Sequence, residues 1–489
     1  FAEVKGDTEI TDDSNEVKLV FTVIPGNKTY TRKILFTGND VTQDHVLRRE
    51  MRQFEGAWTS DNSIEAGKVR LERLGYFKEV NVETIPVVGT EDQIDIVYSV
   101  DEETTGSVGG NIGYSDFGLM LGFNLQEQNF LGTGNTVGIG INKNIYSEMY
   151  NLSFMNPYAT KDGVSLGYNV YFRETDYGEF NVANYLTNSN GFGAQFGYPT
   201  SDITRLGFNV TYDKTDIDVG TLPALEIYDF VSAEGNIFET LSVQFSWQRI
   251  TLNRGLFPTA GSSTVISLST TVPGSDLSYY RSSIRQRYYR PLSSNFVFGF
   301  SGELGYLDAY GDTEETPFFQ NFYAGGPRSL RGFESNTLGP RSTDAPCYEF
   351  NYEEKTCPNL IDTDGDGELD APYINPYAGS TSRYRDRPIG GNIKVEGSMQ
   401  LIFRLPFIED QRSLRSAFFF DFGNVFSDNC KDYQINCYKP AIEDLRYSYG
   451  VGVTWITGFG PLSLAISKPT NAGPQERTEE FQFTVGNVF

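Results

Sequence analysis

The stretch LRYSYGVGVTW, residues 445–455, shows the pattern that decides the fold. Apolar and aromatic residues occupy every second position, and arginine, serine, glycine and threonine occupy the positions between them. Alternation with a period of two is typical of a β-strand whose two faces meet different surroundings. The pattern returns in LSVQFSWQ (241–248) and in FVFGFSGELGY (296–306). One face of the predicted sheet is therefore apolar and aromatic, and the other is small and polar.

The connections between such stretches fall into a short and a long set. The short ones include residues 156–163, 198–203 and 291–295, and the opposite ones include 175–189, 216–239 and 309–391. Short turns at one end and long loops at the other are typical of an outer-membrane barrel. A β-sandwich would instead have to cover its apolar face with a second sheet. We count about sixteen strands, an even number as in such barrels. The sequence predicts a mainly β protein dominated by a 16-stranded antiparallel transmembrane β-barrel, whose long loop, about 309–391, folds inward.

Composition and charge exclude several other classes. The chain has 489 residues and a net charge of −25, which argues against nucleic acid as a partner. It lacks the run of about 18 apolar residues that a membrane helix needs, so strands must cross the bilayer if the chain spans one. A single histidine, His45, excludes a multi-histidine metal site and leaves few routes to catalysis. We therefore expect a protein that is not an enzyme and requires no cofactor.

The first hundred residues follow a different pattern. Alternating residues at 17–23 recur at 94–100, an offset of 77 residues, which suggests tandem modules of about that length. Residues 1–24 would be the end of a truncated module, residues 25–103 a complete one, and residues 104–489 the barrel.

The complete module has a predicted order of β-α-α-β-β. A strand near residues 32–37 precedes a first helix, followed by a second helix and two strands. The first helix should carry four apolar residues on one face: Val46, Leu47, Met51 and Phe54. The second should have Asp61 or Asn62 as its N-cap and should end at Gly75.

The junction between the first and last barrel strands is predicted to be weak. Glycine in a strand lowers its packing advantage, although here it could merely ease a tight curve. The residues that we assign to this seam are Gly109, Gly110 and Ile112 in the first strand and Phe483, Val485 and Phe489 in the last.

A motif in the longest loop carries a resemblance to a known family. Residues 322–329 read FYAGGPRS, and Leu330, Arg331, Gly332 and Phe333 follow. The four residues resemble the (V/I/L)RG(F/Y) signature of the outer-membrane insertase superfamily, and the two-helix module resembles POTRA domains. The resemblance implies a Gram-negative outer-membrane protein with periplasmic POTRA domains. It implies that the chain assists the insertion of unfolded β-barrel clients into outer-membrane lipid, together with accessory lipoproteins.

The resemblance also implies that this loop enters the barrel lumen, where Arg331 docks on the inner wall. Alternation directs Glu396 and Gln400 of one strand, and Phe419 and Asp421 of the next, toward the lumen. An arginine that leaves water needs a carboxylate and preferably an aromatic face, and these residues supply both. The family carries an acid on the twelfth strand, where this chain has Gln400 or Glu396. The exact partner therefore stays open.

The four cysteines form two close pairs, Cys347 with Cys357 and Cys430 with Cys437. Neither pair has the short spacing of a zinc site. We expect two small disulfide-closed loops in an oxidising compartment, with free thiols as the alternative.

An acidic stretch in the long loop, DTDGDGELD (362–370), resembles a calcium-binding loop. Oxygen ligands at alternate positions suit a hard cation, although Tyr373 stands where an EF-hand has its last glutamate. The stretch is either a structural Ca²⁺ site or a plain acidic loop. Its candidate ligands are Asp362, Asp364, Asp366 and Asp370.

Two functions remain after these steps. The first is an insertase that uses the seam to offer a strand edge to its clients. Arg48 and Glu55 would then belong to the surface on which accessory lipoproteins dock. The alternative is a secretion pore of the two-partner type, which would share the POTRA modules, the barrel and the loop motif.

Overall fold

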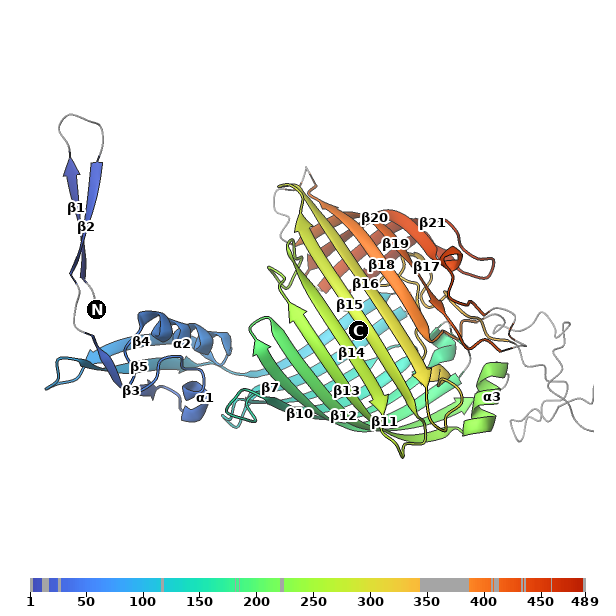
Figure 1. The fold of residues 1–489 in the computed structure, drawn as a ribbon, viewed down its shortest axis with the longest axis horizontal. Helices are drawn as coiled ribbons and strands as arrows, with labels where there is room; N and C mark the ends of the chain where they lie inside the picture. Colours follow the sequence, from blue (N-terminus) through green and yellow to red (C-terminus); the bar gives the residue numbers. More distant parts are fainter. Residues whose placement is uncertain are drawn as a thin grey trace, which may run out of the picture. The chain divides into compact units, whose positions relative to one another are not determined.

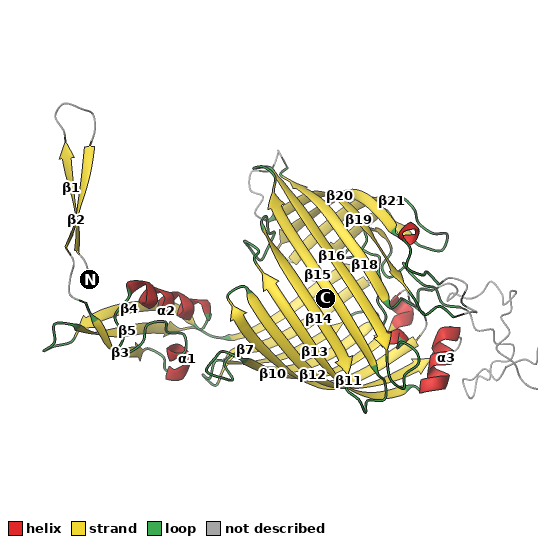
Figure 2. Cartoon of the chain, in the orientation of Figure 1, coloured by secondary structure: helices red, strands yellow, loops and turns green. Residues whose placement is uncertain are grey.

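The computed structural model forms two compact units, residues 1–107 with 126–137 and residues 108–125 with 138–489. The structure describes residues 3–486 except 11–16, 25–27, 116–117, 181, 184, 220–223, 344–386, 406–407, 409–412, 432–433, 435–436 and 459. Strands dominate both units (Figure 1, Figure 2). In the described part of the chain, every helix is too short or too polar to cross a membrane.

The first unit contains a three-stranded sheet with two helices. Its elements in chain order are β3 (Tyr30–Thr37), α1 (Asp44–Arg48), α2 (Asp61–Arg73), β4 (Phe77–Pro86) and β5 (Gln93–Glu102). The strand order is β3-β5-β4, with β3 parallel and β4 antiparallel to β5. The preceding hairpin pairs β1 (Glu3–Ile10) with β2 (Val17–Ile24).

The core of this module differs from the expectation at two helix ends. Helix α1 stops at Arg48, so Met51 is buried beyond the helix and Phe54 is 69% exposed instead of sharing its apolar face. The N-cap of α2 is Ser60, one residue before the predicted Asp61: its backbone is extended and its hydroxyl accepts the Ser63 N–H. Val46, Leu47, Leu71, Ile96 and Tyr98 lie in the core.

Glu102, the last residue of β5, closes the loop before α1. Its carboxylate accepts the backbone N–H groups of Val41 (2.8 Å) and Thr42 (2.6 Å). Burial alone would raise the pKa of Glu102, but the hydrogen bonds from Thr42 and Val41 outweigh it and hold the pKa below its ordinary value. A carboxylate with a lowered pKa stabilises the folded state only while it is charged.

We therefore expect the first unit to lose stability as the pH falls below about 4.3, the ordinary pKa of glutamate. The loss should reach about 1 kcal/mol, because the carboxylate is partly exposed, and Glu102→Gln should remove this part of the pH dependence. Urea unfolding followed by the fluorescence of Trp58, with Trp247 and Trp455 replaced by phenylalanine, measures it in the whole chain. An unchanged pH dependence in Glu102→Gln would contradict the assignment.

The other main part of the fold is a closed barrel of sixteen strands, which confirms the predicted fold class. Its strands are β6 (Gly106–Ser115), β7 (Gly118–Phe130), β8 (Asn135–Lys143), β9 (Ser147–Asn156), β10 (Ser165–Asp176), β11 (Tyr185–Ser201), β12 (Thr204–Val219), β13 (Ile237–Ile250), β14 (Gly261–Thr271), β15 (Tyr279–Pro291), β16 (Phe296–Ala309), β18 (Ile393–Phe403), β19 (Leu414–Phe426), β20 (Arg446–Thr457), β21 (Gly460–Pro469) and β23 (Phe481–Val485). We call the end that holds the connections after β9, β11, β13, β15, β18 and β20 the turn end, and the opposite end the loop end.

The two faces of the barrel wall follow the alternation of the sequence. In β19, Phe418 and Phe420 point outward and are 51% and 41% exposed, whereas Phe419 and Asp421 point inward and are buried. Large apolar side chains that are about half-exposed cover the outside of other strands as well, for example Phe245 and Leu268. This outer surface suits a lipid environment.

The barrel closes through its weakest described junction. Strand β23 forms five residue pairs with β21, but among the described residues only Val485 pairs with Tyr114 of β6. The rings of Tyr114 and Phe483 stack across this junction, with centroids 5.5 Å apart. Among the described residues, the remaining backbone of β6 toward Gly106 does not pair with β23.

Candidate functional site

The loop between β16 and β18 brings the motif at 330–333 into the lumen. Leu330 and Phe333 are fully buried and pack with Leu307, Phe322 and Val425 of the loop and the wall. These two apolar anchors fix the position of Arg331, which lies between them in the sequence and reaches the inner face of β19.

Arg331 meets a carboxylate, a hydroxyl and an aromatic ring. Its Nε and Nη2 atoms donate to the two oxygens of Asp421, each at 2.7 Å, and its backbone N–H donates to the same group at 3.2 Å. Nη2 also donates to Ser398 (3.0 Å), and the guanidinium carbon lies 3.4 Å from the centroid of the Phe419 ring. Ser448 donates to the carbonyl of Arg331. The loop tip is thus held by contacts from three successive strands, β18 to β20.

The burial of this ion pair decides its energetic importance. The side chain of Asp421 is fully buried, and that of Arg331 is 15% exposed. A buried pair gains little over an apolar pair of the same shape, but removing one partner typically costs about 3–5 kcal/mol because it leaves a buried charge. The pair therefore locks one position of the loop.

The question of the exact partner is settled by this geometry. Asp421 binds Arg331, whereas Glu396 accepts a hydrogen bond from Ser329 (2.6 Å) and pairs with Lys394 (3.1 Å). Gln400 donates to Ser398 at 3.4 Å. Glu396 and Gln400 thus face the lumen as expected, but neither contacts the guanidinium directly.

A clamp between the loop and the closing strand was missed by the sequence reasoning. Gln482 of β23 donates to the carbonyl of Phe333 (2.7 Å) and accepts the N–H of Gly332 (3.3 Å). Gly332 has φ 92°, a conformation that strains any larger residue, and a Cβ there would meet Ser467 and Ser448 in tight contacts of 3.2–3.3 Å. The signal was present, because Gln482 is the polar position between Phe481 and Phe483. The loop thereby holds the strand that forms one side of the seam.

The structure places the remaining predicted seam residues as follows. Gly109 and Gly110 are exposed in β6, and Ile112 is 66% exposed. Phe483 and Val485 face β6 from β23. Phe489 lies outside the described residues.

Arg48 and Glu55 form an ion pair in the first unit, with Arg48 Nη1 at 3.1 Å from Glu55 Oε1. The backbone N–H of Ile34 (2.9 Å), together with Arg48, holds the pKa of Glu55 below its ordinary value. Both side chains are about 45% exposed, so the pair presents one charge of each sign at the surface. Its role in docking stays a prediction.

Cys430 and Cys437 form a disulfide. Cys347 and Cys357, and the acidic residues Asp362, Asp364, Asp366 and Asp370, lie outside the described residues. Within the described part of the chain, no three acidic, histidine or cysteine residues gather as a metal site. The Ca²⁺ site therefore stays a prediction.

A family model described as the Omp85 superfamily domain matches residues 129–489, and one described as a surface antigen variable number repeat, the POTRA model, matches residues 29–103. The chain belongs to the Omp85 superfamily and carries a POTRA domain. This confirms the resemblance to the outer-membrane insertase superfamily.

Particular relatives share most of the chain. It is 31% identical to the outer membrane protein assembly factor BamA of Neisseria meningitidis serogroup B, over 98% of this chain and 59% of that protein. It is 22% identical to the sorting and assembly machinery component 50 homolog of Bos taurus, over 88% of this chain and 84% of the relative. The crystal structure of BamA from Haemophilus ducreyi lacking POTRA domains 1–3 matches with a TM-score of 0.80 and 32% identity, over 100% and 90% of the two chains. The chain spans about three fifths of the Neisseria relative.

Proposed function

We propose that this chain assists the folding and insertion of β-barrel proteins into the bacterial outer membrane. Relatives named as outer-membrane assembly factors support the proposal. The observation that carries it is the closing junction, where Val485↔Tyr114 is the residue pair that joins β23 to β6 in the described chain.

A weak seam can lower the main free-energy cost of insertion, which comes from unpaired backbone groups in lipid. Each backbone group that enters lipid without a hydrogen-bond partner costs several kcal/mol. A strand edge that is exposed beside the bilayer can pair with an incoming strand and satisfy these groups during entry. Strand β6 offers such an edge, because its glycines at 109 and 110 lower the packing advantage of its pairing with a neighbouring strand.

The docked loop is a feature that a secretion pore would share, so it does not by itself separate the two functions. The loop tip is fixed on the inner wall by Arg331 and Asp421. At the loop end, helix α3 (Leu225–Glu234) contributes Ile227 and Phe230 to a buried cluster with Phe318 and Ile389. A polypeptide that crossed the lumen would have to displace the docked loop tip.

The proposed partners are unfolded β-barrel clients, outer-membrane lipid and accessory lipoproteins. The first unit would face the periplasm, and the exposed Arg48–Glu55 pair is our candidate for lipoprotein docking. Exposed ion pairs of this kind contribute little to stability, so a partner could replace the contact between the two side chains at a small cost.

The test is the refolding of an unrelated urea-denatured barrel protein into liposomes with and without this chain. We expect insertion to be at least tenfold faster with the chain, scored by the shift in gel migration between heated and unheated samples. Ion conductance without any acceleration would instead favour the pore. An unrelated porin in the same liposomes is the control for a general disturbance of the bilayer.

A further inference from the structure

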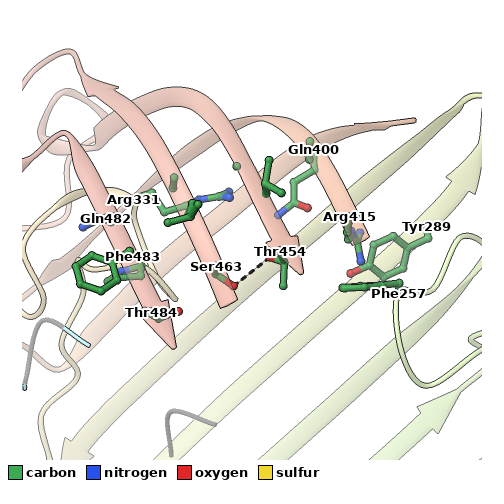
Figure 3. A pocket seen from close by; sticks show the side chains of 16 residues that line it. Phe257, Tyr289, Arg331, Gln400, Arg415, Thr454, Ser463, Gln482, Phe483 and Thr484 are labelled. Carbon is green, nitrogen blue, oxygen red and sulfur yellow. Dashed lines mark hydrogen bonds between the residues drawn. The ribbon is translucent and has the colours of Figure 1, made fainter. Parts of the chain in front are cut away.

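The closing strand β23 contacts its neighbours over a short length. It pairs with β21 through five residues, with Phe483 opposite Leu464 and Thr484 opposite Ser463 (Figure 3). On its other side, one described residue pair joins it to β6. The register of β23 on β21 therefore decides which of its residues reaches β6.

The sequence of β23 is compatible with more than one register. It reads FQFTV, so apolar and polar side chains alternate. A slip by one residue along β21 would turn the apolar side chains into the lumen, but a slip by two residues would keep them outside. The clamp by Gln482 does not exclude such a slip by itself, because the residues two positions away, Glu480 and Thr484, are also polar. Contacts outside β23 must therefore fix its register.

A buried ion pair holds the loop that leads into this strand. Arg446, the first residue of β20, donates through Nε to both carboxylate oxygens of Glu476, at 2.8 and 2.7 Å. Glu476 lies in the loop at 470–480, and its side chain is fully buried, whereas that of Arg446 is 7% exposed. The same carboxylate accepts the N–H of Gly473 (2.7 Å), and Arg446 Nη1 donates to the carbonyl of Asp444 (3.1 Å). Both charged groups are thus paired and hydrogen-bonded in this one position of the loop.

Further contacts fix the chain between Glu476 and β23. The carbonyl of Arg477 accepts the N–H of Glu334 (3.0 Å). The next two residues form β22 (Thr478–Glu479), which pairs with β17 (Gly332–Phe333) of the inward loop. A shift of β23 along β21 would therefore have to move Glu476 as well.

We propose that Arg446 and Glu476 are positioning residues that set the register of the closing strand on β21. A slip by two residues moves a strand by roughly 7 Å, which would separate the two charges while both are buried. Breaking a buried pair is strongly unfavourable, and fixing a register is the best-attested use of buried charged groups. The register belongs to the barrel itself, so the proposal goes beyond the proposed function and can be tested without a client protein.

Disulfide trapping reads the register directly. In the present register Leu464→Cys and Phe483→Cys are opposed and should form a disulfide. Phe483→Cys combined with Ile466→Cys or with Leu462→Cys reports a two-residue slip in either direction. Without a slip these diagonal pairs are about 7–8 Å apart, beyond the usual reach of a disulfide. After brief oxidation and denaturation, trypsin cuts at Arg477 and separates the two cysteines, so mass spectrometry of the linked peptides gives the fraction of each disulfide.

Glu476→Gln should raise the larger of the two slipped fractions at least fivefold over the otherwise unchanged chain. The double variant Arg446→Gln with Glu476→Gln should do the same, although it leaves neither charge unpaired. A rise in the single variant alone would overturn the proposal, because an unpaired charge and not the lost contact would then disturb the strand. If the single variant does not fold, the double variant decides the outcome.

The matched control is Glu334→Gln, which breaks an ion pair of 3.5 Å with Arg477, the residue next to Glu476, and keeps the backbone N–H of residue 334. The side chains of Arg477 and Glu334 are 50% and 36% exposed, so the slipped fractions should stay unchanged. Retention of heat-modifiable gel migration shows that each variant is folded. Unchanged slipped fractions in both Glu476 variants, or an equal rise in Glu334→Gln, would overturn the proposal.

Discussion

Arg331→Ala should reduce the acceleration of client insertion by at least tenfold while the barrel itself stays folded. The substitution leaves the fully buried carboxylate of Asp421 without its cation, at a cost of about 3–5 kcal/mol to the docked loop. We expect the loop to leave the wall, because water can then hydrate the carboxylate of Asp421 and remove this cost. The clamp of Gln482 on Gly332 and Phe333 would then be lost as well. The closing strand would lose the support that positions it at the seam.

Two readouts separate this effect from unfolding. Trypsin should cut the released loop at Arg328 or Arg341, whereas unheated samples should still migrate as a folded barrel. Asp421→Ala should have a similar effect, and the double variant should be no worse than either single one, since the unpaired buried charge is then gone. Unchanged trypsin resistance in Arg331→Ala would contradict the assigned role.

The matched control is Arg285→Gln. Arg285 also pairs with a lumen carboxylate, Glu303, at 2.8 Å. Its side chain is 66% exposed, so water replaces much of what the pair supplies. We expect a change of less than twofold in insertion rate. Comparing Arg331→Ala with Arg285→Gln tests the effect of burial, because the two ion pairs have nearly the same N···O distance.

The barrel could be predicted from the sequence because the residues on the two faces of each strand alternate, apolar toward the outside and small or polar toward the lumen. The alternation predicts that Phe418 and Phe420 point outward, and both are exposed in the structure. It predicts that Phe419 and Asp421 point inward, and both are buried. That Arg331 docks on the inner wall was implied by the family resemblance, and the alternation supplied the candidate partners on that wall.

What the sequence could not provide was the pairing between distant segments. Glu396 and Asp421 were equally good partners by type, and only the position of the loop assigns Ser329 to the first and Arg331 to the second. The clamp by Gln482 spans 149 residues to Phe333, so no local pattern reports it. The early end of α1 could not be predicted for a similar reason. Met51 is an apolar core residue, as expected, but it reaches the core from the chain that follows the helix.

A disulfide between Tyr114→Cys and Val485→Cys should abolish most of the acceleration of client insertion. These two residues face each other across the seam, and directly opposed antiparallel residues have Cα atoms about 4.5–5.5 Å apart, within the range that a disulfide spans. Closing the junction removes the edge of β6 from incoming strands. Oxidation should lower the insertion rate at least tenfold, and a reductant should restore it. The reduced double variant is the baseline, since it has already lost the stacking of Tyr114 on Phe483.

The control disulfide joins Met399→Cys and Phe420→Cys, which are paired and outward-facing in β18 and β19. This junction is paired along eleven residues, so locking it removes no edge that a client could use. Oxidation and reduction should leave its insertion rate unchanged, and any effect of reducing Cys430–Cys437 would be the same in both variants. If the locked seam inserts clients as fast as the control, the edge of β6 is not the route, and clients must enter lipid at another part of the barrel surface.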